Sequence, residues 1–158
     1  MTSSTKITDS HCHLDFPDFD DARAEYINRA VEAGVHRMVT ICTRLKNEPN
    51  VRAIAEEFAP VFYAAGTHPM SAAEEPLTSV EELCRMAKHP KMVGIGETGL
   101  DYHYTADSKD IQQKSLRIHC AAAAEAAGRA RGAPRALRTS RGRRGAAFPR
   151  SWGPGCGF

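Results

Sequence analysis

Short apolar runs recur about every 30 residues in the first part of the chain, and amphipathic segments separate them. This rhythm predicts strands that alternate with helices. Four such units in series are typical of a parallel α/β architecture. The first expected strand begins at Ile7, and the others cover Val35–Cys42, Val61–Ala65 and Met92–Gly96. The expected helices cover Phe19–Ala33, the segment after Asn47 with Pro49 in its first turn, Ser79–Ala87, and Asp110 to about Ala127. Asp18, Asn47 and Ser79 are the expected N-caps of the first three helices.

Polar side chains collect just after each predicted strand. A doubly wound sheet would carry a glycine-rich phosphate loop after its first strand, but residues 11–15 contain no glycine. In a (β/α)8 barrel, by contrast, the positions after the strands line the catalytic mouth. That barrel needs about 250 residues, and the part of this chain with the strand–helix rhythm is about half as long. We therefore predict the first four βα units of an incomplete TIM-type barrel. The polar residues concerned are His11 and His13, Thr43 and Arg44, Thr67 and His68, and Glu97 and Asp101.

Charge divides the chain into two parts that its net charge of +2 conceals. Residues 1–125 carry 13 Lys and Arg against 19 Asp and Glu, a net −6, whereas residues 126–158 carry eight Arg and no acid, a net +8. The second part consists mostly of Ala, Arg, Gly and Pro and has no hydrophobic periodicity. Such a segment buries too little surface to offset its ordering entropy. We therefore expect a partial barrel over 1–127 and a disordered basic tail over 128–158.

Three interpretations of this tail stay open. An Arg/Gly segment binds nucleic acid through phosphate contacts. It can equally be an inert solvated tail. It can also be the product of a GC-rich gene read in the wrong frame, because Ala, Arg, Gly and Pro all have codons made only of G and C. The abrupt loss of every acid and of all periodicity favours the third interpretation.

The segment His11-Cys12-His13 has the spacing of a metal-binding pair. Side chains alternate across a strand, so the two imidazoles point one way and Cys12 the other. Two imidazoles on one side of a strand end can both reach a divalent cation. Asp9 and Asp15 are candidates for orienting the rings. Alone this pattern is weak, since two exposed polar residues on a loop fit it as well.

Glu97 and His68 are expected at the same end of the barrel. Glu97 directly follows the apolar run 92–96, and a carboxylate placed there without a cationic partner would be costly. His68, held extended by Pro69, can donate a proton or hold an anionic substrate. His119 falls within a predicted helix and is assigned to packing or to the surface.

The five cysteines are scattered, odd in number and contain no C-x-x-C pair. This pattern argues against a disulfide framework and for a reducing compartment. The first residues lack the apolar stretch of a secretory signal, and no run of 18 apolar residues exists. We expect a cytoplasmic protein that does not span a membrane.

Three ordered blocks resemble the TatD family of metal-dependent hydrolases. They are Asp9–Pro17 (DSHCHLDFP), Gly66–Pro69 (GTHP) and Val93–Tyr104 (VGIGETGLDYHY). The resemblance covers roughly the first 120 residues and none of the tail. It implies a (β/α)8 barrel and a cytoplasmic deoxyribonuclease that hydrolyses phosphodiester bonds of DNA by a metal-activated water.

The resemblance also implies roles for individual residues. His11, His13 and Glu97 match metal ligands, with Glu97 bridging two divalent ions (Mg, Mn or Zn). His68 matches a substrate-side histidine, so His68 and Glu97 are the catalytic candidates, and Asp9 and Asp101 are candidate supporting carboxylates.

The resemblance ends where the family's remaining ligands should follow, because no His occurs after His119 and no acid after Glu125. We therefore expect little or no nuclease activity from this chain, and self-association through its exposed barrel edges. Two other functions remain: a non-catalytic nucleic-acid-binding protein that uses the basic tail, and another amidohydrolase-type enzyme.

Overall fold

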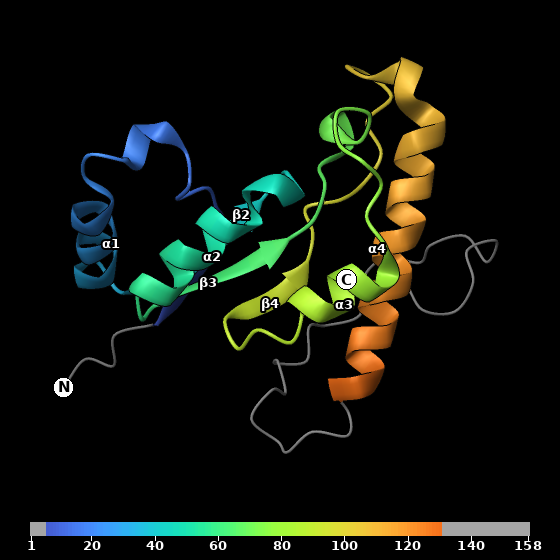
Figure 1. The fold of residues 1–158 in the computed structure, drawn as a ribbon. Helices are drawn as coiled ribbons and strands as arrows, with labels where there is room; N and C mark the ends of the chain where they lie inside the picture. Colours follow the sequence, from blue (N-terminus) through green and yellow to red (C-terminus); the bar gives the residue numbers. More distant parts are fainter. Residues whose placement is uncertain (1–5, 131–158) are drawn as a thin grey trace.

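The computed structural model describes residues 6–130 and places four parallel strands in one sheet (Figure 1). The strands follow chain order across the sheet, β1-β2-β3-β4, and each neighbouring pair is parallel. Their bounds are Ile7–Cys12 for β1, Val35–Cys42 for β2, Val61–Ala65 for β3 and Met92–Ile95 for β4. The predicted α/β class and the four successive βα units are confirmed.

A helix follows each strand, after a single 3₁₀ turn in the connecting loop. Helix α1 packs on β2, α2 on β2 and β3, and α4 on α3 and β4, so that α1 and α4 lie at opposite ends of the fold in Figure 1. The helices are α1 at Arg23–Glu32, α2 at Glu48–Glu57, α3 at Val80–Met86 and α4 at Lys109–Ala130, and the 3₁₀ turns are η1 at Pro17–Phe19, η2 at Leu45–Asn47, η3 at Pro69–Ser71 and η4 at Ala106–Ser108.

The prediction that Asp18 caps a helix over Phe19–Ala33 is wrong. The segment Pro17–Phe19 forms the 3₁₀ turn η1, and α1 begins only at Arg23, with no side-chain cap hydrogen bond. Arg23 Nη2 donates to Asp20 Oδ1 at 2.5 Å, while its Nε donates to a carbonyl oxygen just after β1. This guanidinium ties the turn to the loop that follows β1.

The other predicted boundaries fare better. Helix α2 does begin directly after Asn47 with Pro49 in its first turn, but Asn47 makes no side-chain cap hydrogen bond. Ser79 is confirmed as the cap of α3, since its Oγ accepts from the backbone N–H of Glu82 at 3.1 Å. Gly34 follows α1 at φ 100°, the left-handed conformation that a helix C-terminus favours.

The main core lies between the sheet and its covering helices. Alternate residues of β2 and β3 face it, as the period of a strand requires. Side chains of α2 and the loop residue Leu14 fill the other side. The core residues contributed by these elements are Met38, Cys42, Val61, Tyr63, Ala65, Val51, Ile54, Ala55 and Leu14.

The two outer strands are open edges. Within residues 6–130, β1 pairs only with β2 and β4 only with β3. Their side chains Ile7 and Val93 are 52% and 45% exposed. No helix of the same part of the chain has the length and apolarity needed to cross a bilayer. We predict a disordered basic tail over 128–158. Its residues after the end of α4, 131–158, lie outside the described residues.

Candidate metal centre at the carboxyl ends of the strands

The two edge strands bring three candidate ligands together. His11 and His13 come from the end of β1, and Glu97 comes from the loop after β4. One ligand atom from each residue lies within 4.8 Å of the other two. In a flat sheet β1 and β4 would stand about 14 Å apart, so this meeting requires the sheet to curve. Closure of parallel strands into a barrel produces such curvature.

His13 is oriented with one ring nitrogen available for a cation. Its Nδ1 lies 3.1 Å from the carbonyl oxygen of Ile41 in β2. A carbonyl oxygen only accepts, so Nδ1 carries the proton and Nε2 keeps its lone pair. The ring also stacks on Phe16, with the centroids 4.8 Å apart. The predicted alternation holds as well, because Cys12 Sγ turns away to the carbonyl of Val39 at 3.4 Å.

His68 has the opposite tautomer at the same edge. Its Nδ1 accepts a hydrogen bond from the backbone N–H of Met70 at 3.2 Å, so in the neutral ring the proton lies on Nε2. That Nε2 lies 3.7 Å from Glu97 Oε1. His68 therefore presents a donor to the site, whereas His13 presents a lone pair. This difference suits His68 for meeting an anionic group and His13 for holding a cation.

The Glu97 carboxylate lies between histidines from two strands. Its Oε2 is 3.7 Å from His11 Nε2, and its Oε1 is 3.7 Å from His68 Nε2. Both separations exceed a hydrogen bond. The Glu97 side chain is 32% exposed, against 52% for His11 and 27% for His68. The Glu97 side chain is thus partly exposed, and neither of these two histidines lies close enough to its carboxylate to hydrogen-bond it.

Gly66 sets how closely the loops after β3 and β4 approach each other. A Cβ at this position would lie 2.7 Å from the carbonyl oxygen of Glu97 and 2.7 Å from the Cα of Gly96. Both are backbone atoms, so any larger residue must push the Glu97 segment away. This packing role of Gly66 could not be predicted from the sequence, because a glycine at the end of a strand is equally typical of a simple turn.

The predicted supporting carboxylates lie in different places. Asp9 Oδ1 accepts from the backbone N–H of His11, one of the three candidate ligands, at 3.0 Å. Asp101 Oδ1 accepts from the amides of His103 and Tyr104, both at 2.8 Å, and these hydrogen bonds lower the pKa of its carboxyl. The hydrogen bonds of this carboxylate are within its own loop, and a role at the site stays a prediction.

The residues present fit a divalent cation. Two imidazoles and a carboxylate are the usual protein ligands of zinc and of related divalent ions. A divalent ion would be held by one nitrogen of each imidazole and one carboxylate oxygen, atoms that lie within 4.8 Å of one another. Two buried oxygens without a partner among the described residues, Asp15 Oδ1 and Thr98 Oγ1, belong to residues close in the chain to His13 and Glu97.

Comparison with known proteins supports the same chemistry. The uncharacterized metal-dependent hydrolase YabD of Bacillus subtilis is 36% identical over 120 residues, 74% of this chain and 46% of YabD. The 3'-5' ssDNA/RNA exonuclease TatD of Shigella flexneri is 26% identical over 107 residues, 68% of this chain and 41% of that protein. The chain thus spans about half the length of the relatives it matches.

A solved structure shows the same half. The crystal structure of YjjV, a TatD homologue from Escherichia coli K12, superposes with a TM-score of 0.69 at 31% identity. The match covers 77% of this chain and 48% of YjjV, and supports the predicted first half of a TIM-type barrel. The model of the family described as TatD related DNase matches residues 8–128. Four βα units, the His-His-Glu cluster at their carboxyl ends and this match together place the chain in the TatD family of metal-dependent hydrolases.

Proposed function

We propose that His11, His13 and Glu97 hold a divalent cation, and that this centre belongs to a TatD-type hydrolase of phosphodiester bonds. The observation that carries the proposal is the convergence of two imidazoles and one carboxylate within 4.8 Å. The ligand atoms come from opposite edges of the sheet, so only the folded chain assembles them. Mg²⁺, Mn²⁺ and Zn²⁺ all suit these ligands, and one or two ions would fit the family pattern.

Each residue has a defined part in the proposed chemistry. A divalent cation at the site supplies Lewis-acid charge and offsets the negative charge of a phosphate. His13 keeps its Nε2 lone pair toward the centre because Ile41 fixes its tautomer. His68 directs its Nε2–H to the same edge, where it can donate to a phosphate oxygen. Glu97 connects the candidate metal ligands with His68, because its carboxylate belongs to the His11, His13 and Glu97 cluster and also lies 3.7 Å from His68 Nε2.

DNA is the substrate we propose for the family centre. The family description names a DNase, and the Shigella flexneri relative is named for ssDNA and RNA. This chain offers three ligands and half of a barrel mouth, so we propose that it binds a cation but hydrolyses DNA slowly or not at all. We further propose the cytoplasm as its compartment.

The decisive experiment is Mn²⁺ titration of the purified full chain by calorimetry, with and without Glu97→Gln. We expect the wild type to bind Mn²⁺. The loss of a residue that only supports a ligand costs roughly 10- to 100-fold in metal affinity, and we expect the loss of this ligand to weaken binding further. Glu25→Gln, an exposed carboxylate on α1, is the matched control and should bind like wild type. Equal Mn²⁺ affinity in all three proteins would refute the site.

A second measurement separates the alternative functions. Cleavage of single-stranded DNA with Mg²⁺ or Mn²⁺, at a rate lost in Glu97→Ala, would overturn the expected inactivity. Salt-dependent DNA binding that survives loss of His11 and His13, but not of residues 129–150, would instead favour a binding protein that uses the basic tail. Hydrolysis of lactones, amides or phosphotriesters by an intact relative would favour another amidohydrolase activity.

We also propose that the open edges of β1 and β4 pair with a second copy of the chain. Each of these strands has one neighbour within the described residues, and each exposes an apolar side chain, Ile7 or Val93. Unpaired strand edges are templates for pairing with another chain. Because the fold matches half of a barrel, a second half of the same size fits the open side.

A further inference from the structure

One face of α4 buries polar side chains. Gln112, Ser115 and His119 are 0%, 4% and 1% exposed. Their spacing of three and four residues places them on one stripe of the helix. The same helix also makes apolar contacts, because Ile118 and Ala122 pack in one cluster with residues of α3. Buried polar groups destabilise a fold unless they are hydrogen-bonded, so the partners of this stripe decide what it does.

His119 joins α4 to the loop after β3. Its Nδ1 donates to the carbonyl of Ser115 at 2.8 Å, and its Nε2 accepts from the backbone N–H of Thr67 at 3.1 Å. Both ring nitrogens are therefore occupied in the neutral form. Burial lowers the pKa of His119, which favours that neutral form. Thr67 lies between Gly66 and His68 in the chain. A Cβ at Gly66 would meet the Glu97 backbone, so this part of the loop packs closely against the Glu97 segment.

Gln112 joins the same helix to the loop after β4. Its Oε1 accepts from the backbone N–H of Asp101 at 2.7 Å. Its Nε2 lies 2.9 Å from the carbonyl oxygens of both Asp101 and Thr105, so the amide bridges the two ends of the Asp101 turn. Glu97 is four residues before Asp101 in this loop.

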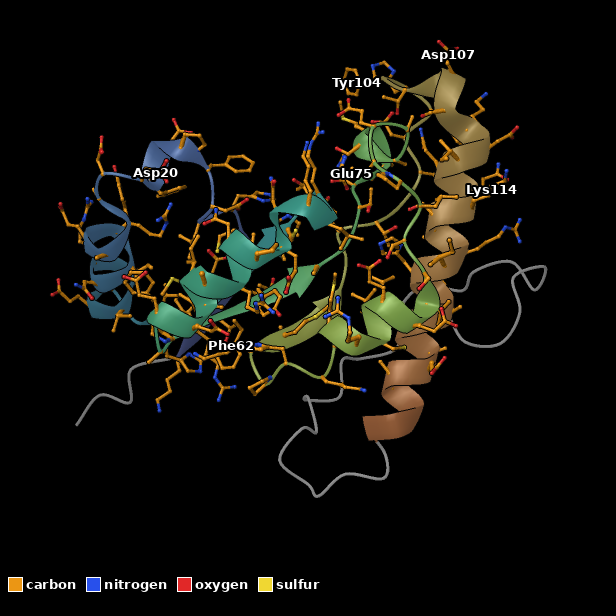
Figure 2. All side chains as sticks on the ribbon, in the orientation of Figure 1. Asp20, Phe62, Glu75, Tyr104, Asp107 and Lys114 are labelled. Atoms are coloured by element: carbon orange, nitrogen blue, oxygen red, sulfur yellow. The ribbon has the colours of Figure 1, made fainter. Side chains whose placement is uncertain are left out.

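The two loops lie along the first half of α4. In Figure 2, Tyr104 in the loop after β4 lies near the level of Asp107 at the start of α4, and Glu75 in the loop after β3 lies lower, near the level of Lys114. Figure 1 shows both loops rising beside this helix, and the hydrogen bonds of Gln112 and His119 confirm the contact. One helix thus contacts both of the loops that carry His68 and Glu97.

We propose that Gln112 and His119 are positioning residues, which fix the loops after β4 and β3 so that Glu97 and His68 face the metal centre. The inference rests on the proposed function of that centre. An apolar stripe would fill the same space, but it would not select one register of the loop backbone. The hydrogen bonds to Thr67 and Asp101 do select one register, because each is made by one particular backbone N–H of its loop.

Amide hydrogen exchange and Mn²⁺ affinity of the full chain test this proposal. His119→Leu removes the acceptor, and Thr67 N–H should then exchange at least about tenfold faster, while amides in β2 keep their protection. Mn²⁺ should bind about tenfold more weakly, the scale of losing a ligand-supporting residue. His119→Gln, whose amide oxygen can accept from Thr67, should restore both. Gln112→Leu should act in the same way on the Asp101 amide and on Mn²⁺.

Ile54→Val in α2 is the control for a purely structural effect, because it loosens the core without touching α4. If it weakens Mn²⁺ binding as much as His119→Leu at matched stability, the positioning role is wrong. Unchanged Thr67 exchange in His119→Leu would also refute it. If His119→Leu does not fold, His119→Gln and Gln112→Leu carry the test. Failure of wild type to bind Mn²⁺ would overturn the proposed function, whereas the exchange measurements would still decide the loop contacts.

Discussion

Gly66 is the residue at which packing and the candidate site are most directly linked. A Cβ there would lie 2.7 Å from the carbonyl oxygen of Glu97, a backbone atom that cannot swing aside. We predict that Gly66→Ala displaces the Glu97 segment, destabilises the chain by about 1–3 kcal/mol as overpacking does, and weakens Mn²⁺ binding. Urea unfolding and calorimetry measure the two effects.

Gly128→Ala is the matched control for that substitution. A Cβ at Gly128 meets nothing within 4 Å, and the residue lies in α4, so alanine should stabilise the chain by about 0.5–1 kcal/mol through helix propensity. Mn²⁺ affinity should stay at the wild-type value. If Gly66→Ala behaves like Gly128→Ala, the close approach of the two loops does not matter to the site.

How far a site residue can be predicted depends on whether the signal is local. The cluster of His11, His13 and Glu97 follows from strand alternation and from the rule that parallel strands end at one edge. The acceptor role of His119 does not follow, because its partner, Thr67, is 52 residues away in the chain. Nothing local distinguishes a helical histidine that packs from one that holds a loop.

At the scale of elements, α3 is a seven-residue helix whose start depends on one hydroxyl. Ser79 Oγ accepts from the N–H of Glu82 at 3.1 Å. We predict that Ser79→Ala lowers the free energy of unfolding by about 1 kcal/mol, the usual cost of losing a cap. Urea unfolding measures the loss. Ser79→Asp keeps an acceptor and should unfold like wild type, whereas equal losses in both variants would contradict the capping role.

Helix ends show why element boundaries were predicted unevenly. Ser79 is a cap in both sequence and structure, because its partner is three residues away. Asp18 has the same chemistry but lies inside the 3₁₀ turn η1, which Arg23 ties to the loop after β1. That tie depends on where the strand ends in space, and propensity rules do not include it.

At the scale of the whole molecule, the fold combines a converged cluster of candidate metal ligands with a sheet that has open edges. The curvature that brings β1 and β4 side chains to one centre is that of a barrel, yet each of these strands has one partner within residues 6–130. The spacing of three motifs and the loss of periodicity after the last helix predict a partial barrel of this kind. They do not predict which surface pairs with the open edges of β1 and β4.

The open edges lead to a prediction about assembly. The chain has a mass of 17.3 kDa, and we expect light scattering after size exclusion to give a larger mass that falls on dilution. Val93→Lys places a charge on the β4 edge, which blocks edge-to-edge pairing, and should return the chain to a monomer. Val31→Lys is the matched control, because Val31 on α1 is 44% exposed against 45% for Val93 and belongs to neither edge strand. A wild-type monomer at every concentration, or the same shift in both variants, would show that the edges are satisfied in another way.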